Sequence, residues 1–193
     1  MRPTGLVLVL VTLTALPARG VEAGWDDPKP GAFQLLGSFF LGSGLRFNNP
    51  YRLATPLGST AESVSRTATY ADAGIGATFG DPRRLQHGLA LRLSWALSGV
   101  GQMVSTPSYL LWTRGRVFAA YGRLGIPVVL TPDVTWGLES AVGAVWFFRG
   151  AVGVAGELVG GVFYGAGTRD VTTAAYPVLS GQLGLVVALE RYP

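Results

Sequence analysis

Residues 88–98, GLALRLSWALS, decide the fold of this chain. Large apolar residues alternate in this stretch with small or polar ones, and side chains in an extended strand point to opposite faces in turn. One face therefore carries Leu89, Leu91, Leu93, Trp95 and Leu97. The opposite face carries Gly, Ala and Ser together with the single charge of Arg92. A strand of this kind separates an apolar environment from a polar one.

The same period-two pattern recurs along the chain and predicts seven strands. They lie at residues 33–42, 70–79, 88–98, 109–130, 137–146, 152–164 and 179–190, with Leu36 and Phe40 on the would-be inner face of the first. Residues 46–66, 99–107 and 165–175 are rich in turn-forming and polar residues and are predicted to be loops. The segment 109–130 is long. Either a bulge shifts its register, or a tight turn at Arg114-Gly115 divides it into two strands.

The composition favours a membrane protein that crosses with strands. Hydrophobic residues make up 49% of the chain and charged residues only 13%, against about 25% charged residues in a typical soluble domain. Beyond residues 5–16 there is no run of eighteen uncharged apolar residues, so a bundle of membrane-spanning helices is disfavoured. The chain has no cysteine, which excludes disulfides and thiolate metal sites. No metal and no cofactor are expected.

Residues 1–23 are predicted to be a secretory signal peptide. Arg2 supplies the positive start, residues 5–16 form a twelve-residue apolar stretch, and Val21-Glu22-Ala23 offers small residues for cleavage. The remaining residues, 24–193, form the predicted barrel domain. The 15 basic and 11 acidic residues are scattered along the chain, so nucleic acid is not an expected partner.

These observations predict an all-β fold, an antiparallel up-and-down transmembrane β-barrel. Single-chain bacterial barrels have an even number of strands, so eight are expected. The eighth strand lies within residues 46–66 or arises from division of 109–130. A soluble exported calycin-like barrel is the alternative, and it would place the Leu and Trp side chains inside.

The charged residues within the strands are expected to face the lumen. An Arg that faces lipid at the bilayer midplane costs ~2–4 kcal/mol, and charges enclosed in a narrow barrel must pair. We therefore predict a lumenal network that joins Asp72, Glu139 and Glu157 to Arg92 and to Arg114 or Arg116. A filled lumen of this kind argues against a wide pore.

The hairpin at residues 141–157, AVGAVWFFRGAVGVAGE, resembles the small outer-membrane β-barrels of the OmpA/OmpX type, and the resemblance extends over the mature chain. The last strand is similar to the signal read by the barrel assembly machinery, in Gln182, Gly184, Val187, Leu189 and Tyr192, although Pro193 follows Tyr192. The resemblance implies export to the outer membrane of a Gram-negative bacterium. Membrane lipid and lipopolysaccharide, and the assembly machinery during insertion, are then the expected partners. The resemblance carries no ligand site.

The expected function is non-enzymatic, structural or surface-interacting, through residues 46–66 and 165–175. The alternatives are a narrow porin-like channel or oligomeric pore and, less favoured, a lipid-modifying enzyme. Against an enzyme, the single histidine, His87, has no Ser in the two positions after it. The arginines Arg46, Arg52 and Arg66 lie near a loop and could meet lipid phosphates, although ordinary solvated charges explain them more simply. If the C-terminus is periplasmic, residues 165–175 lie outside the cell.

Overall fold

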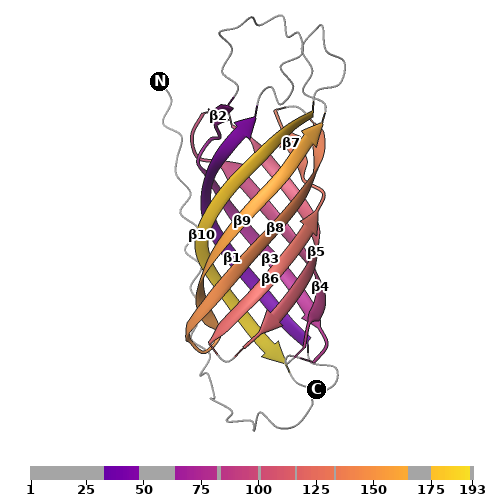
Figure 1. Cartoon of the computed structure of the whole chain (residues 1–193), viewed down its shortest axis with the longest axis vertical. Helices are drawn as coiled ribbons and strands as arrows, with labels where there is room; N and C mark the ends of the chain where they lie inside the picture. Colours follow the sequence, from indigo (N-terminus) through magenta and orange to yellow (C-terminus); the bar gives the residue numbers. More distant parts are fainter. Residues whose placement is uncertain are drawn as a thin grey trace, which may run out of the picture.

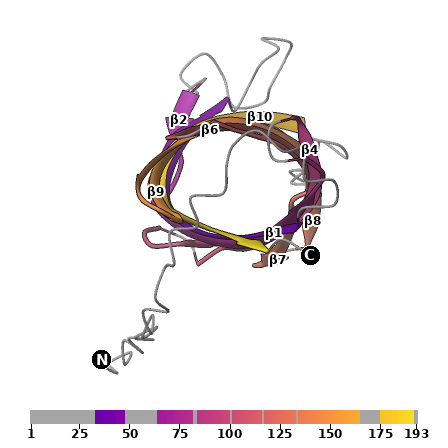
Figure 2. The ribbon, with the colours of Figure 1, turned by 90° about the horizontal axis from the view of Figure 1, so that it is seen from below.

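The computed structural model describes residues 33–47, 64–81, 84–99, 101–115, 117–132, 134–164 and 175–191. These residues form antiparallel strands that close into a barrel (Figures 1 and 2). The segments are β1 Phe33–Phe47, β2 Val64–Arg66, β3 Tyr70–Phe79, β4 Gln86–Ala96, β5 Met103–Arg114, β6 Phe118–Gly125, β7 Val128–Thr131, β8 Thr135–Arg149, β9 Val152–Tyr164 and β10 Ala175–Arg191. The predicted all-β antiparallel barrel is confirmed.

Ten segments make eight barrel strands, because two of the strands are interrupted. The short β2 continues β3 along β1 after one extra residue, since Leu45 pairs with Arg66 whereas Gly42 pairs with Tyr70. The segments β6 and β7 keep one register against β8 and are separated only at Ile126 and Pro127. A proline has no backbone N–H to offer the ladder. The predicted number of eight is therefore correct.

The barrel closes where β10 pairs with β1 over the length of the wall. A path that starts at Phe33 on β1 and follows the paired residues once round the barrel returns to β1 at Ser43. The strands are therefore staggered by 43 − 33 = 10 residues. With a rise of ~3.3 Å per residue and a strand spacing of ~4.8 Å, eight strands with this stagger tilt by about 40° from the barrel axis. The tilt is visible in Figure 1.

The outer wall is apolar and the interior is polar at mid-height. On β4 the side chains of Leu89 and Leu91 are 68% and 48% exposed, whereas that of Arg92 between Leu91 and Leu93 is 4% exposed. The bulky stripe of residues 88–98 therefore faces outward, as the sequence predicts. The calycin-like alternative, with its Leu and Trp side chains inside, is wrong.

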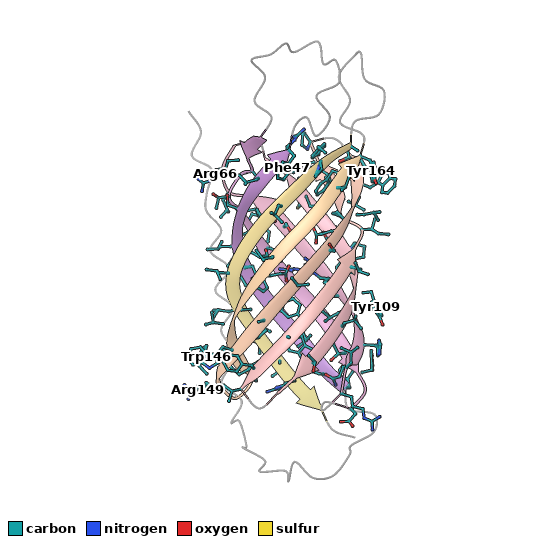
Figure 3. All side chains as sticks on the ribbon, viewed as in Figure 1. Phe47, Arg66, Tyr109, Trp146, Arg149 and Tyr164 are labelled. Atoms are coloured by element: carbon teal, nitrogen blue, oxygen red, sulfur yellow. The ribbon has the colours of Figure 1, made fainter. Side chains whose placement is uncertain are left out.

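The two ends of the barrel differ. We call the end where β1 begins and β10 ends the turn end, and the end where β1 finishes at Phe47 the loop end. Outward aromatic pairs lie at both: Phe33 with Phe79 and Trp146 with Phe148 at the turn end, and Trp136 with Tyr164 at the loop end. Figure 3 shows Trp146 near the lower end of the wall and Tyr164 near the upper end.

All seven predicted segments contain strands, with corrections to the loops and bounds. The segment 109–130 does contain parts of two barrel strands, divided after Arg114. The prediction of a loop at 99–107 was wrong, because β5 begins at Met103. The first strand and the predicted loop at 46–66 also need adjustment, since β1 runs on to Phe47 and β2 occupies Val64–Arg66. The predicted signal peptide, residues 1–23, lies outside the described residues.

No helix among the described residues has the length and apolar character needed to cross a membrane.

Candidate functional site: the charged lumen

Glu157 is the centre of a buried polar network at mid-height in the barrel. Its side chain comes from β9 and is almost fully buried. Its Oε1 accepts hydrogen bonds from Arg92 Nη1 at 2.7 Å, Arg123 Nη2 at 2.8 Å and Gln182 Nε2 at 2.7 Å. Its Oε2 accepts from the Tyr121 hydroxyl at 2.6 Å and also from Arg92 Nη1, at 2.9 Å. One carboxylate thus joins four strands: β4, β6, β9 and β10.

Arg92 connects Glu157 to a second carboxylate. Its Nε donates to Asp72 Oδ1 at 2.6 Å, and its Nη2 lies at the same distance from that oxygen. Asp72 also accepts a hydrogen bond from Ser94 Oγ on β4. The guanidinium carbon of Arg92 lies 4.7 Å from the centre of the Phe40 ring, a cation–π distance.

Arg123 on β6 connects Glu157 to a third carboxylate, Glu139 on β8. Arg123 Nη1 lies 2.5 Å from Glu139 Oε1. The Arg123 side chain is 4% exposed and that of Glu139 14%, so Glu139 is the carboxylate nearest to solvent in this network. An isolated buried charge is far more costly than a paired one, and this chain of alternating charges pairs each buried guanidinium with two carboxylates.

The structure brings four of the six predicted lumenal residues together. Asp72, Arg92, Glu139 and Glu157 share the network. Arg114 or Arg116 was predicted to join it. Arg114 lies instead at the turn end, where its guanidinium carbon is 4.5 Å from the centre of the Phe147 ring and its Nη2 donates to the Gly150 carbonyl. Arg116 lies outside the described residues.

Sequence reasoning missed Arg123, although a signal was present. The alternation Ala119, Tyr121, Arg123 identifies one face of β6, but the register of 109–130 was ambiguous. Once the turn after Arg114 ends β5, the exposed Phe118 and Leu124 define the outer face of β6. Arg123 must then face the lumen. Its place beside Glu157 follows from the pairing of β6 with β8 and of β8 with β9.

Glycines make room for the large side chains of the network. A Cβ on Gly143 would lie 2.3 Å from the Tyr121 ring, and one on Gly42 would lie 2.5 Å from the Tyr70 ring. Real Cβ atoms do not approach other atoms so closely. Glycine at these two positions therefore leaves room for the aromatic rings against the backbone. The Tyr121 hydroxyl can thereby reach Glu157.

Above the network a cup of about 320 Å³ extends toward the loop end. Its lower wall includes Asp72, Arg123 and Glu139, and its upper wall includes Tyr70 and Tyr176. The Tyr176 ring is stacked on Phe163 on one side and lies 3.8 Å from the Arg46 guanidinium carbon. The volume is enough for several water molecules, which each occupy about 30 Å³ in the liquid.

Below the network the lumen is filled by an apolar cluster and, at the turn end, by the buried polar side chains of Gln34, Thr78 and Gln86. The buried cluster consists of Leu36, Phe40, Leu110, Trp112, Ala119, Val145, Phe147, Ala155, Val186 and Ala188, with Tyr121 packed against it. The remaining space between this cluster and the ion pairs is about 50 Å³. The described residues therefore form a cup that is closed toward the turn end.

The described residues supply no arrangement typical of catalysis or metal binding. No group of three or more His, Cys, Asp or Glu side chains in this part of the chain could hold a metal ion. His87 is exposed on the outer wall, and its Nδ1 pairs with the Tyr109 hydroxyl. The three lumenal carboxylates are each engaged with a guanidinium.

Residues of the predicted assembly signal also have contacts in the folded barrel. Gln182 faces the lumen and donates to Glu157. A Cβ on Gly184 would lie 2.0 Å from the Phe39 carbonyl oxygen, so this glycine permits close pairing of β10 with β1. Leu189 is exposed on the outer wall. Tyr192 lies outside the described residues, and recognition by the assembly machinery stays a prediction.

No protein-family model matches the chain, and no curated protein does. Among solved structures, the crystal structure of Neisserial surface protein A (NspA) is 13% identical, with 82% of this chain and 98% of that chain covered and a TM-score of 0.47. A de novo designed transmembrane β-barrel is 9% identical, with coverage of 84% and 98% and a TM-score of 0.47. The outer membrane protein OprG from Pseudomonas aeruginosa is 12% identical, with coverage of 84% and 97% and a TM-score of 0.39.

Proposed function

We propose that this chain is an integral outer-membrane barrel without enzymatic activity, which does not conduct ions and acts at the cell surface. The single observation that carries the proposal is the inversion of polarity. Large apolar side chains cover the outside, while Asp72, Arg92, Arg123, Glu139 and Glu157 are enclosed. In water such an exterior would expose apolar area far beyond that of an ordinary monomer. In a bilayer the same apolar exterior contacts the hydrocarbon chains of the lipid.

The height of the apolar wall supports the same proposal. On β8 the outward residues run from Trp136 to Trp146, 146 − 136 = 10 residues apart. Ten residues span ~33 Å along a strand, which a tilt of about 40° reduces to about 25 Å along the axis. The apolar band of outer-membrane barrels, between its aromatic girdles, is about 25 Å tall.

The filled lumen favours a structural or surface role over the channel alternative. Eight strands leave an interior just wide enough for side chains to fill. Among the described residues, the ion pairs and the apolar cluster beneath them occupy it, leaving a cup toward the loop end. Transport would require both the ion pairs and the apolar cluster to rearrange. An interaction at the cell surface requires no such change.

Electrical recording on the purified, detergent-folded chain tests the proposal. Insertion into planar bilayers should give no current steps, whereas a sixteen-stranded porin, which encloses an aqueous channel, should conduct in the same bilayers. The same preparation should migrate differently in gels before and after boiling, and should sediment with outer membranes after cell fractionation. Reproducible unit steps from the monomer would contradict the closed lumen. Recovery in a detergent-free soluble fraction would contradict the membrane assignment.

A further inference from the structure

The outer wall has a shallow, open groove, which crosses β8, β9, β10 and β1. Its volume is about 1000 Å³, at the upper limit of small-molecule sites. Its floor is made of the small outward residues Ser43, Gly181, Gly156 and Ala144, and the longer side chains Leu41, Leu158 and Leu183 stand beside them. A Cβ on Gly181 would meet only a Leu158 methyl, at 3.8 Å. The space above this backbone is therefore open to an apolar occupant.

The register shows that the groove descends from near the loop end past mid-height. Ser43 pairs with Gly181, Gly156 pairs with Ala144, and Gly156 lies on the strand beside Gly181, one side-chain position lower. With the tilt of about 40°, three strand steps and one two-residue step lower the floor by about 15 Å along the axis. On β8 the lower end, Ala144, lies eight residues from Trp136 and two from Trp146. The floor therefore crosses the middle of the apolar wall.

The upper end of the groove is basic and polar. Arg66 and Thr69 both line it and are exposed. Arg66 Nε donates to Ser43 Oγ at 3.3 Å, which holds the side chain along the outer wall. Figure 3 shows Arg66 on the outside of the barrel near its upper end, the end where Tyr164 also lies. Among the described residues no carboxylate is within ion-pair distance of Arg66.

We propose that this groove binds lipid A, with one acyl chain on the glycine floor and a phosphate at Arg66. The proposal rests on the outer-membrane assignment above. Arginine pairs with phosphate through charge-assisted hydrogen bonds, and the Ser43 and Thr69 hydroxyls can donate to the remaining oxygens. Both ends of the described barrel chain, Phe33 and Arg191, lie at the turn end. With these ends in the periplasm, the upper end of the groove, with Arg66, lies in the outer leaflet, whose phosphorylated lipid is lipid A.

Lipid titration of the folded barrel tests the proposal. The chain without residues 1–23, the predicted signal peptide, is folded in detergent and titrated with lipid A, and native mass spectrometry measures the bound fraction. Arg66→Gln should weaken binding about tenfold, because it removes a charge-assisted contact with phosphate. Gly181→Leu should weaken it as much by filling the floor. Two controls should bind like the wild type: Arg149→Gln, an exposed arginine at the turn end, and Ala77→Leu, an outward substitution on β3 away from the groove.

Each result has a distinct meaning. Equal binding by the wild type, Arg66→Gln and Gly181→Leu would overturn the site, and so would equal weakening by the two controls. Phosphatidylglycerol bound as tightly as lipid A, with the same dependence on Arg66, would overturn the choice of lipid A. Heat-modifiable migration is measured on every sample. If the barrel folds and inserts but binds no lipid A, only the proposed lipid A site is wrong. If the chain stays soluble without detergent, the proposed function itself is wrong.

Discussion

At the scale of single residues, Glu157 has the largest predicted effect on stability. It accepts hydrogen bonds from Arg92, Arg123, Tyr121 and Gln182. Removal of its carboxylate leaves two buried guanidinium groups short of a partner, and breaking a buried ion pair costs about 3–5 kcal/mol. We expect Glu157→Ala to lower the free energy of unfolding by that amount, measured by urea denaturation of the barrel in detergent micelles or lipid vesicles.

Glu139→Ala is the matched control for this substitution. Glu139 is the more exposed of the two carboxylates and is held by Arg123 alone among the described guanidinium groups. Water can replace part of what is lost, so the decrease should be clearly smaller than for Glu157→Ala. If Glu157→Ala unfolds at the wild-type urea concentration, the network does not stabilise the barrel.

At the scale of elements, the β8–β9 hairpin shows how a turn is encoded. The sequence predicted a hairpin at residues 141–157, and Gly150 at its turn has a φ of 54°. An L-residue in this left-handed region costs ~1–2 kcal/mol. Gly150→Ala should therefore lower the free energy of unfolding by about this amount, whereas Gly150→Asn should cost less, because asparagine tolerates this conformation.

Gly101→Ala is the control for the turn, measured in the same denaturation experiment. Gly101 has no positive φ, and nothing lies within 4 Å of the Cβ it would gain. Its replacement should leave the unfolding curve unchanged. If Gly150→Ala leaves the unfolding curve as unchanged as Gly101→Ala does, the hairpin tolerates an ordinary residue at its turn.

The elements also show what the sequence could not reveal. Residues 70–79 and 152–164 alternate cleanly, and both strands were predicted to the residue. β5 was cut short because Pro107 and the polar residues before it are typical of a loop. In the barrel, Pro107 lies opposite the break between β6 and β7, and its carbonyl accepts the Ile126 N–H. Pairing between strands thus supports a segment whose local sequence favours a loop.

The same limit applied to the charged network. Alternation predicted that Asp72, Arg92, Glu139 and Glu157 face inward, but it could not say which charges meet. That depends on the ten-residue stagger round the barrel, which sets the relative heights of residues on strands far apart in sequence. The stagger places Arg123 beside Glu157 and leaves Arg114 at the turn end.

At the scale of the whole molecule, closure and polarity depend on each other. Because β10 pairs with β1, no strand edge is left open along the wall, and lipid cannot hydrogen bond to an unpaired backbone. Closure also confines the charged side chains to a space where they must neutralise one another. The described interior has an open cup toward the loop end, ion pairs at mid-height and an apolar cluster toward the turn end, where the polar side chains of Gln34, Thr78 and Gln86 are also buried.

The position of the barrel in the bilayer can be measured along β8. The chain has no cysteine, so single substitutions Leu138→Cys, Val142→Cys and Ala144→Cys can each carry a spin label on the outer face. If the apolar wall spans the membrane, the ratio of oxygen to nickel-complex accessibility should be highest at Val142, midway between Trp136 and Trp146. It should fall toward both ends, because water and polar headgroups begin there. A label at Ala141, which is 5% exposed and faces inward, should be shielded from both reagents. A flat profile, or nickel accessibility at Val142 equal to that of a surface loop, would mean that water and not lipid surrounds the outer stripe.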